Sequence, residues 1–378
     1  MALPGLLLTV LAGPTVPTPL PEPVLSRLRS VKVTETDSER SAFSLTLDAG
    51  RSGPLAAFDN PLLADSPLQP GARVVLVVTP GAVPTVLFDG IVTETQLTPG
   101  DRPGSATFDV KGEDVSYLMD LEERDVEYPA LTDHLQVLAV LAPYAAQGIL
   151  PAAVPAPVAD PSLPTEQVPT QQTTDLRHLA ALAGRNGYVA YVVPGPVPGV
   201  SSFYWGPPVR AGLPQPALSI DLGAQTNVAS APTFRTDAVA PTQVTGEVQD
   251  PGSGQSVPVQ ARASVRPPLA AVPLSAVAPV RIRRLRESGP GTATAMGRAQ
   301  AAVDAGADAV VGEGEIDGAR YGAVLRPRGL VGVRGAGWSF DGLWYVRQVV
   351  HEIAPGSYRQ KFVIVREGHG STVPAVVV

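Results

Sequence analysis

Three carboxylates near the end of the sequence have a spacing that could serve acid–base chemistry. Glu313, Glu315 and Asp317 alternate along the segment GEGEID, and alternate residues of a β-strand share one face. Glycoside hydrolases use two neighbouring carboxylates, but one of them must lie in a cleft that raises its pKa. Carboxylates on one face of a turn-flanked strand are more often solvated. We therefore expect no catalytic residue here and keep a hydrolase as an alternative interpretation.

The histidines give little support for a metal site. His351 and Glu352 begin like the zinc motif His-Glu-x-x-His, but Pro355 replaces the second histidine and the surrounding pattern is that of a strand. The other histidines, which show no ligand spacing, are His134, His178 and His369. The chain has no cysteine, which excludes thiolate ligands, thiolate nucleophiles and disulfides. The sequence predicts no metal site and no cofactor.

Glycines and arginines that could bind phosphate groups are present, but their context argues against this role. Gly332–Gly337 (GVRGAG) approaches a dinucleotide fingerprint, yet no helix follows it, so we expect a hairpin or a bulge. A basic cluster is divided between the two faces of a strand by its spacing. It consists of Arg281, Arg283, Arg284 and Arg286. Because the formal net charge is −7, we expect no direct binding of nucleic acid or of an anionic membrane.

Aromatic residues offer one further candidate for ligand binding. Trp205, Trp338 and Trp344 lie in strand-like segments, where tryptophan usually packs in a core or an interface. We expect packing of this kind. The alternative is a binding module that stacks a ligand on exposed tryptophan rings.

The composition favours a mainly β fold for the elements that carry these residues. Hydrophobic residues make up 44% and charged residues 17% of the 378 residues, which is typical of a globular protein. The 41 prolines and 37 glycines interrupt the chain too often for a helical bundle and suit short strands joined by turns. No apolar run is long enough to span a bilayer, and no Lys or Arg precedes the apolar residues 3–12. We expect synthesis in the cytoplasm and no membrane insertion.

Residues 1–116 are predicted to form a first antiparallel β-barrel. Val31 and Val33 alternate with polar residues, as do the apolar residues of Phe43–Leu47, which is typical of half-buried strands. Further strands are expected at residues 73–79, 86–94 and 106–111.

Residues 117–193 are predicted to be an α/β insertion with two short helices. The first, Leu131–Gln147, has Thr132 as a cap, is shortened or kinked by Pro143 and ends near Gly148. Its apolar stripe is expected to comprise Leu135, Leu138, Ala139 and Ala142. The second helix is expected at Thr174–Asn186. Frequent prolines in residues 150–170 predict an extended loop, which is a candidate contact site.

Residues 194–378 are predicted to form a second β-barrel region. Strand patterns return from Val200 and dominate the segment Ala309–Glu367. An Ala-rich segment followed by Gly306 predicts one short helix near residues 293–305.

A short sequence recurs in the two predicted barrel regions. Phe88-Asp89-Gly90 is followed fourteen residues later by Gly104-Ser105 and a strand, and Phe340-Asp341-Gly342 is followed at the same distance by Gly356-Ser357 and a strand. We interpret the recurrence as an internal duplication. The alternative is that Phe-Asp-Gly is a common hairpin turn that occurs twice by chance. The candidate repeated structural turns are Phe88, Asp89, Gly90, Gly104, Phe340, Asp341, Gly342 and Gly356.

A duplicated chain has a consequence for symmetry. Three copies of a two-barrel chain in a ring present six similar units around one axis. One end of the ring can then meet a six-fold partner, while the other end remains three-fold. Joining a six-fold tube to a three-fold tip is a task that needs such a subunit.

Three segments resemble the phage late-control protein D family, the hub of contractile tails, whose module also forms the N-terminal part of VgrG spikes. They are Phe88–Thr93 (FDGIVT), Asp175–Tyr191 (DLRHLAALAGRNGYVAY) and Phe340–Gly368 (FDGLWYVRQVVHEIAPGSYRQKFVIVREG). The order of the segments carries the resemblance, which extends over most of the chain. The resemblance implies two tube-protein-like antiparallel β-barrels with inserted α/β elements, assembled as a trimer around a channel.

The function implied by the resemblance is mechanical, and the chain is not expected to be an enzyme. It would be the structural baseplate hub of a contractile tail or an extracellular contractile injection system, a homotrimer that adapts the six-fold inner tube to a three-fold spike. Tube and baseplate proteins are the other expected partners. VgrG proteins continue into a needle, whereas this sequence ends at Val378, so we expect the spike to be a separate trimeric protein. The alternatives are a tail-tip cell-wall hydrolase and a host-surface binding module.

Overall fold

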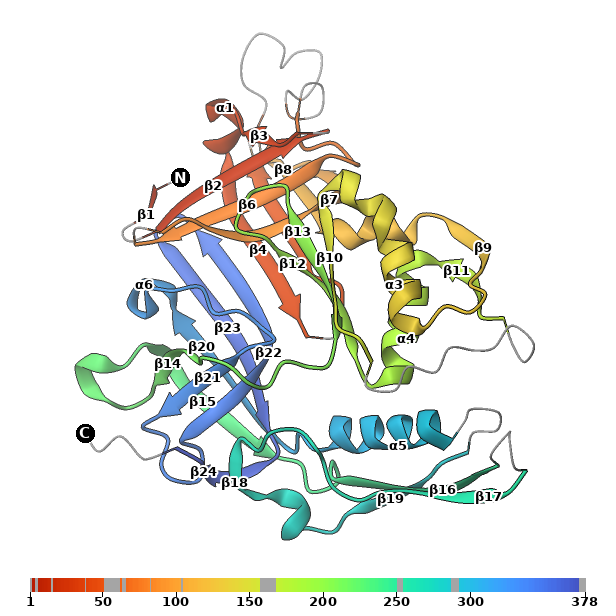
Figure 1. Ribbon diagram of the computed structural model, residues 1–378. Coiled ribbons are helices and arrows are strands. Elements are labelled where there is room, and N and C mark those ends of the chain that lie inside the picture. Colours follow the sequence, from red (N-terminus) through yellow and green to blue (C-terminus); the bar gives the residue numbers. More distant parts are fainter. Residues whose placement is uncertain are drawn as a thin grey trace.

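The structure is a computed structural model that describes residues 2–3, 6–14, 16–37, 39–50, 62, 66–81, 83–102, 105–156, 168–249, 254–286 and 292–373. The described chain is mainly β, as predicted, and fourteen of its strands join one large, mostly antiparallel sheet. Figure 1 shows the N-terminal strands of this sheet at the top, the C-terminal strands below, and the longer helices on one side.

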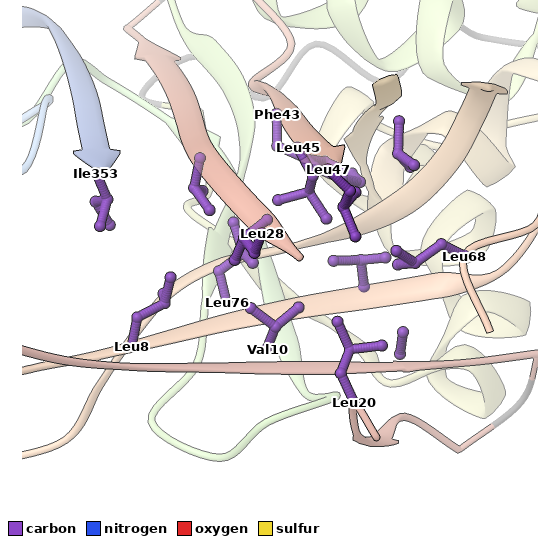
Figure 2. Packing of buried hydrophobic residues seen from close by; sticks show 14 of the residues in the cluster. Leu8, Val10, Leu20, Leu28, Phe43, Leu45, Leu47, Leu68, Leu76 and Ile353 are labelled. Atoms are coloured by element: carbon purple, nitrogen blue, oxygen red, sulfur yellow. The ribbon is translucent and has the colours of Figure 1, made fainter. Parts of the chain in front are cut away.

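The first half of the large sheet comes from the N-terminal region. Its elements are β1 (Ala2–Leu3), β2 (Leu6–Gly13), β3 (Thr18–Pro19), α1 (Glu22–Leu25), β4 (Leu28–Thr36), β5 (Ala42–Asp48), β6 (Arg73–Pro80), β7 (Thr85–Thr98) and β8 (Thr107–Asp114). The strand order is β1-β2-β6-β7-β8-β5-β4, and β3 pairs with β2. Apolar residues at alternate positions, such as Phe43, Leu45 and Leu47, point into a core that Figure 2 shows in detail. The predicted strand pattern is confirmed here.

The second half comes from the C-terminal region. Its elements are β14 (Gln215–Ser219), a 3-10 turn at Gly223–Gln225, β15 (Val228–Thr236), β20 (Val310–Asp317), α6 (Gly318–Tyr321), β21 (Leu330–Arg334), β22 (Gly342–Ala354) and β23 (Ser357–Arg366). Their order is β14-β21-β22-β23-β20-β15. A second core, which includes Trp344, Val346 and Ile364, lies against these strands.

The two halves share one strand order. In the first half, β4, β5, β6, β7 and β8 are arranged as β6-β7-β8-β5-β4, and all neighbours are antiparallel. In the second half, β15, β20, β21, β22 and β23 are arranged as β21-β22-β23-β20-β15, again with antiparallel neighbours. The flanks differ, because β2 is antiparallel to β6 whereas β14 is parallel to β21.

The halves are joined by direct strand pairing rather than forming two separate barrels. β4 pairs with the second part of β22, from Gln348 opposite Thr36 to Ile353 opposite Val31. The ladder is therefore continuous, and among the described strands neither half closes on itself. Two closed barrels were expected, and the structure corrects this. The periodicity of a sequence identifies strands and their buried faces, but it does not identify the partner of each edge.

An α/β insertion follows the first half. Its elements are a 3-10 turn at Val115–Asp120, β9 (Glu123–Glu127), α3 (Asp133–Leu141), a 3-10 turn at Ala142–Gln147, β10 (Ile149–Ala153), β11 (Thr170–Thr174), α4 (Asp175–Asn186), β12 (Val189–Pro194) and β13 (Ser201–Gly206). Both helices are confirmed, with Thr132 and Thr174 accepting capping hydrogen bonds. α3 gives way to the 3-10 turn before Pro143, and Gly148 ends that turn. β13 pairs with β10 and β12, so this small sheet extends beyond residue 193.

The predicted Pro-rich loop is partly a strand. Residues 149–153, including Pro151, form β10, which lies at the edge of the order β10-β13-β12. Proline is tolerated at a sheet edge because its missing N–H can face away from the ladder. Residues 157–167 of the predicted loop lie outside the described residues.

A second insertion separates β15 from β20. It comprises β16 (Thr242–Gln249), β17 (Ser256–Ala261), β18 (Ala270–Pro273), a 3-10 turn at Leu274–Ala276, β19 (Arg281–Arg284) and α5 (Thr292–Gly306). α5 covers the sheet β17-β16-β19, and Val244, Val259 and Ala299 are among the residues of their shared core (Figure 1). β18 pairs with β24 (Gly368–Ser371). None of the helices in the described ranges has the length and apolar character needed to cross a membrane.

Candidate functional site

The junction between the two halves contains a buried polar cluster. Glu35 of β4 is 3% exposed, and its carboxylate lies 3.2 Å from Nη1 of Arg326, which precedes β21. His351 of β22 is fully buried, with Nε2 3.3 Å from Glu35 Oε2 and Nδ1 3.0 Å from the Tyr358 hydroxyl. Arg326 also donates to the backbone carbonyls of Val86 and Leu87 in β7. One cluster thus connects β4, β7, β22 and β23.

Electrostatics favour a carboxylate beside a neutral imidazole in this cluster. Burial alone would raise the pKa of Glu35, but Arg326 and the hydrogen bond with His351 outweigh this effect and hold the pKa below its usual value. Burial lowers the pKa of His351, which keeps its ring neutral at neutral pH. All of these groups except Arg326 lie out of reach of solvent. The cluster can hold the two halves together, but it offers no access to a substrate.

Asp89 connects the first half to the α/β insertion. Its two carboxylate oxygens each lie 2.7 Å from a guanidinium nitrogen of Arg73, and Ser201 Oγ donates to Oδ2 at 2.9 Å. Arg73 also donates to the carbonyl of Gln147 at 2.7 Å. These contacts hold β6, β7 and the start of β13 in one position. Asp89 is therefore a buried structural clamp.

The two Phe-Asp-Gly triplets occupy different places in the fold. Phe88, Asp89 and Gly90 lie inside β7, so the first triplet is not a turn. Phe340 and Asp341 lie in the connection before β22, and Gly342 begins that strand. Gly104 lies outside the described residues.

The second triplet does stabilise a connection. Asp341 Oδ1 accepts a hydrogen bond from the backbone N–H of Ala336, and the Phe340 ring stacks on Phe234 with 4.4 Å between centroids. Gly356 lies in the two-residue connection between β22 and β23, with φ +79°. The recurrence in the sequence therefore marks two structurally different positions. The repeated strand order is a separate observation.

The three alternating carboxylates of β20 have separate surroundings. Glu315 pairs with Arg359, and Asp317 caps α6 by accepting from the N–H groups of Ala319 and Arg320. Glu313 is exposed on the open surface of the sheet. No described carboxylate of this group lies in an enclosed cleft, and none has the surroundings that a general acid requires.

The other candidates from the sequence also have structural positions. His351 and Glu352 do not form a metal site: His351 belongs to the junction cluster, and Glu352 pairs with Lys361. Within the described ranges, no three His, Asp or Glu side chains gather closely enough to hold a metal ion. Gly332 lies in β21, and Gly335 and Gly337 lie in the β21–β22 connection, so a hairpin connection occurs there as predicted. The basic cluster is exposed on and beside β19; it consists of Arg281, Arg283, Arg284 and Arg286.

Two of the three tryptophans pack as expected. Trp205 and Trp344 are fully buried, whereas the Trp338 side chain is 63% exposed in the β21–β22 connection. His178, which showed no ligand spacing in the sequence, is buried in α4 and stacks on Tyr128 with 5.5 Å between ring centroids.

One cavity of about 230 Å³ lies beside the second insertion. Arg210 and Arg266 on its wall both pair with Asp308, and Glu367 accepts hydrogen bonds from two backbone N–H groups at 2.6 and 2.7 Å. These charges already have partners within the protein. The cavity therefore does not show the chemistry of a ligand site.

Two residues of the buried junction cluster, Glu35 and Arg326, were missed by sequence reasoning. Glu35 continues the alternation of Val31 and Val33, so its position on the buried face of β4 could have been predicted from the sequence. Arg326 lies outside the regular strands, and no pattern indicates its role.

Comparison with known proteins gives matches in structure but not in sequence. No protein-family model matches the chain, and no curated protein sequence matches it. A tail protein from Neisseria meningitidis MC58 superposes with a TM-score of 0.64 and 11% identity, covering 96% of this chain and 97% of that chain. The 43 kDa tail protein of prophage MuSo2 from Shewanella oneidensis gives a TM-score of 0.65 and 15% identity, covering 95% and 98%.

A chain of the Francisella PdpA–VgrG complex is also similar. It gives a TM-score of 0.55 and 8% identity, and the match covers 99% of this chain and 60% of that chain. The resemblance expected from the sequence is thus confirmed at the level of the fold. This chain has the fold of phage tail proteins and of a component of a VgrG complex.

Proposed function

We propose that this chain, which has the tail-protein fold, is the structural baseplate hub of a contractile tail or an extracellular contractile injection system. In this role it forms a homotrimer, with one face against the six-fold inner tube and the opposite face against a three-fold spike. The observation that carries the proposal is the strand order shared by β4–β8 and by β15 with β20–β23. We attribute this shared order to an internal duplication of a tube-protein-like unit.

Symmetry connects the duplication to the function. A closed ring of three such chains contains six similar five-strand units, which can present a repeated surface to a six-fold partner. The two insertions, residues 115–206 and 237–309, differ from each other, so the ring keeps only three-fold symmetry where they contribute. The clamps at Glu35 and Asp89 support a rigid adaptor, because they fix the halves and the first insertion to one another.

The proposed role needs no bond chemistry. The carboxylates that suggested a hydrolase are a cap, an ion-pair partner and a solvated side chain. The partners are further copies of this chain, the inner tube protein, other baseplate components and a trimeric spike. In this proposal the chain is made in the cytoplasm and becomes part of a phage tail or a phage-tail-like particle.

The test is the stoichiometry and symmetry of the assembled protein. The chain would be co-expressed with the products of its neighbouring genes, and the particles would be examined by native mass spectrometry and cryo-electron microscopy. We expect three copies in a ring of six similar lobes, bound to three copies of a spike protein. A monomer or a two-fold dimer that persists in the presence of a spike protein would overturn the proposal.

A host-surface binding module is the second candidate, and one observation favours it. Trp338 is exposed on a loop, where an aromatic ring can stack on a ligand. The two functions predict different partners that cover the Trp338 side chain. Protection of Trp338 from a soluble quencher on assembly with tail proteins favours the hub, whereas protection by host-surface glycans alone favours the binding module.

A further inference from the structure

We propose that β15 of one copy pairs with the outer part of β7, Glu94–Thr98, of a second copy. The pairing is antiparallel, and it extends the large sheet from one chain into the next. The inference rests on the proposed function, because it supplies the lateral contact of the ring. It goes further by naming the strands and their register.

The pairing of β4 with β22 inside one chain shows the geometry that we expect for this contact. The first part of β22 pairs with β21 up to Tyr345, and a one-residue irregularity follows at Arg347. Beyond it, the same flank of β22 pairs with β4. One long strand thus holds its own repeat's strand first and then accepts a strand from the other repeat.

β7 has the same construction up to the irregularity. Its first part pairs with β6 up to Ile91, and a one-residue irregularity follows at Thr93. Just before each irregularity, two backbone hydrogen bonds tie the strand to the segment that precedes β6 or β21. They are Gly71 N to Val92 O (2.8 Å), Val92 N to Ala72 O (2.9 Å), Arg328 N to Val346 O (2.8 Å) and Val346 N to Gly329 O (2.9 Å).

The backbone conformation of that preceding segment is also shared. Gly71 and Arg328 both have positive φ, +87° and +65°, although a positive φ is uncommon for a residue other than glycine. Beyond the irregularity, β4 occupies the flank of β22, but no described strand occupies the flank of β7 at Glu94–Thr98. The flank of β22 in the second repeat pairs with β4, so we expect the corresponding flank of β7 to pair with the strand equivalent to β4.

The equivalent of β4 in the second repeat is β15. Following the ladder from Val92 leads through Gly112 and Phe43 to Val33. Following it from Val346 leads through Ile364 and Gly312 to Phe234, with the residues paired in the same order. Phe234 in β15 therefore occupies the position of Val33 in β4. Among the described strands, only β20 pairs with β15, so its other edge is available.

The register follows from the junction. Val33 lies opposite His351, five residues after Val346, and the residue five positions after Val92 is Leu97. The inference therefore places Phe234 opposite Leu97. Extending the antiparallel register gives the neighbouring pairs, which are Thr233 with Thr98, Arg235 with Gln96 and Thr236 with Thr95.

The side chains fit this register. Val33 and His351 are fully buried in the internal junction, and their counterparts Phe234 and Leu97 are half-buried residues that already border the two cores. Thr233 and Thr98 are exposed on the other face, where threonine pairs are favourable across antiparallel strands. Pro232, which lacks an N–H, lies at the end of the paired stretch.

A second copy of this chain supplies the strand that each edge needs. Between β7 and β15 of one chain lie β8, β5, β4, β22, β23 and β20, and Figure 1 shows β7 in the upper part of the molecule and β15 in the lower part. The contact joins two different edges, the outer part of β7 and the free edge of β15. Every copy has both edges, so successive contacts can close into a ring. Internal and external junctions then alternate around the ring with the same geometry.

The test uses disulfide formation in a chain that has no cysteine of its own. The double variant Thr98→Cys, Thr233→Cys would be oxidised after assembly and analysed on denaturing gels without reductant. We expect covalent dimers and trimers, and we expect neither from the two single variants. Mixing the two single variants should give dimers only.

Two controls define the register. Lys32→Cys with Glu352→Cys places cysteines at the equivalent pair of the internal junction, so it should give a link within one chain and no increase in mass. Thr98→Cys with Ala231→Cys is displaced by two residues along the exposed face of β15, and it should give a much smaller linked fraction than the in-register pair.

Native mass measured before oxidation separates this inference from the proposed function. A trimer in which the internal control links but Thr98→Cys, Thr233→Cys does not would overturn the strand contact and leave the hub intact. A chain that stays monomeric with its tail partners present, and that does not link, would overturn both.

Discussion

Glu35 and Arg326, although almost three hundred positions apart in the sequence, form an ion pair with 3.2 Å between Oε1 and Nη1 at the junction of the two halves. The carboxylate is almost completely buried, and the guanidinium also reaches two backbone carbonyls of β7. This ion pair links the two halves of the large sheet, and it leads to the first prediction.

Replacement of Glu35 should weaken the junction. Glu35→Gln keeps the shape of the side chain but leaves Arg326 without its charged partner, and loss of one member of a buried pair costs about 3 kcal/mol. Urea unfolding would measure this decrease in the free energy of unfolding. The control is Glu39→Gln on the exposed turn after β4, which should change the free energy by less than about 0.5 kcal/mol. Equal effects of the two substitutions would contradict the prediction.

Acidification should destabilise the protein through His351. Because burial lowers the pKa of His351 in the folded protein, the unfolded chain binds more protons as the pH falls below the ordinary histidine value of 6.5. The free energy of unfolding therefore decreases with falling pH. The lowered pKa of Glu35 adds a second loss, because stability present above pH 4.5 disappears as this carboxylate protonates in the folded state.

The measurement is the free energy of unfolding between about pH 8 and pH 4 for the parent chain and His351→Gln. The variant should be less stable at neutral pH, since it lacks the contact with Tyr358. Its loss of stability below pH 6.5 should be smaller than that of the parent, because only one histidine whose pKa burial lowers, His178, remains to cause it. A variant with the same pH profile as the parent would show that His351 is not the responsible group.

Gly90→Ala should disturb the pairing of β7 with β8. A Cβ at this position would lie 2.2 Å from the backbone oxygen of Glu113 and 2.4 Å from the Phe88 ring. Neither neighbour can move without shifting the sheet, and we expect a loss of about 2 kcal/mol, as for other overpacked cores. Thermal unfolding is the measurement. Gly184→Ala in α4 meets no atom within 4 Å and should stabilise the protein by up to about 1 kcal/mol.

Asp89→Asn should loosen the α/β insertion from the first half. The substitution removes the charge that holds Arg73 and weakens the bond from Ser201, which we expect to cost about 2 kcal/mol. Hydrogen exchange should accelerate at the start of β13, where Ser201 lies. Glu94→Gln removes an exposed partner of Lys111, so its effect should stay below about 1 kcal/mol. Unchanged exchange in β13 would contradict the clamp.

Trp338→Phe should remove the quenchable part of the tryptophan fluorescence. Trp338 is exposed, whereas Trp205 and Trp344 are fully buried and shielded from acrylamide. The parent chain should therefore show two classes of tryptophan and the variant only the protected class. Strong quenching in the variant would show that a buried tryptophan is accessible in solution.

Local structure could be predicted from the sequence in considerable detail. Alternation located β4–β8, the predicted cap Thr132 located the start of α3, and the helix predicted at Thr174–Asn186 corresponds to α4. The buried face of α3 was wrong, because Leu135 is 46% exposed. The residues buried instead are Gln136, Val137, Val140 and Leu141. A helix of nine residues carries apolar side chains on more than one face, and its tertiary neighbours decide which face is covered.

The partners of strands and charges could not be predicted in the same way. The Phe-Asp-Gly recurrence suggested two repeats. In the structure, however, Phe88 lies within a strand and Phe340 lies in a connection. His351 was noticed for a zinc motif, although its contacts are with Glu35 and Tyr358. These contacts join residues far apart in the chain, and neither spacing nor composition contains that information.

The two-sided pairing of β22 determines how the protein carries force. One flank of this strand is bonded to β23 along most of its length, and the other is bonded to β21 and then to β4. A pull along β22 loads these bonds in shear, so many must yield together rather than one after another. In the proposed hub, a load applied to the second half would therefore reach the first half through the backbone hydrogen bonds between β22 and β4.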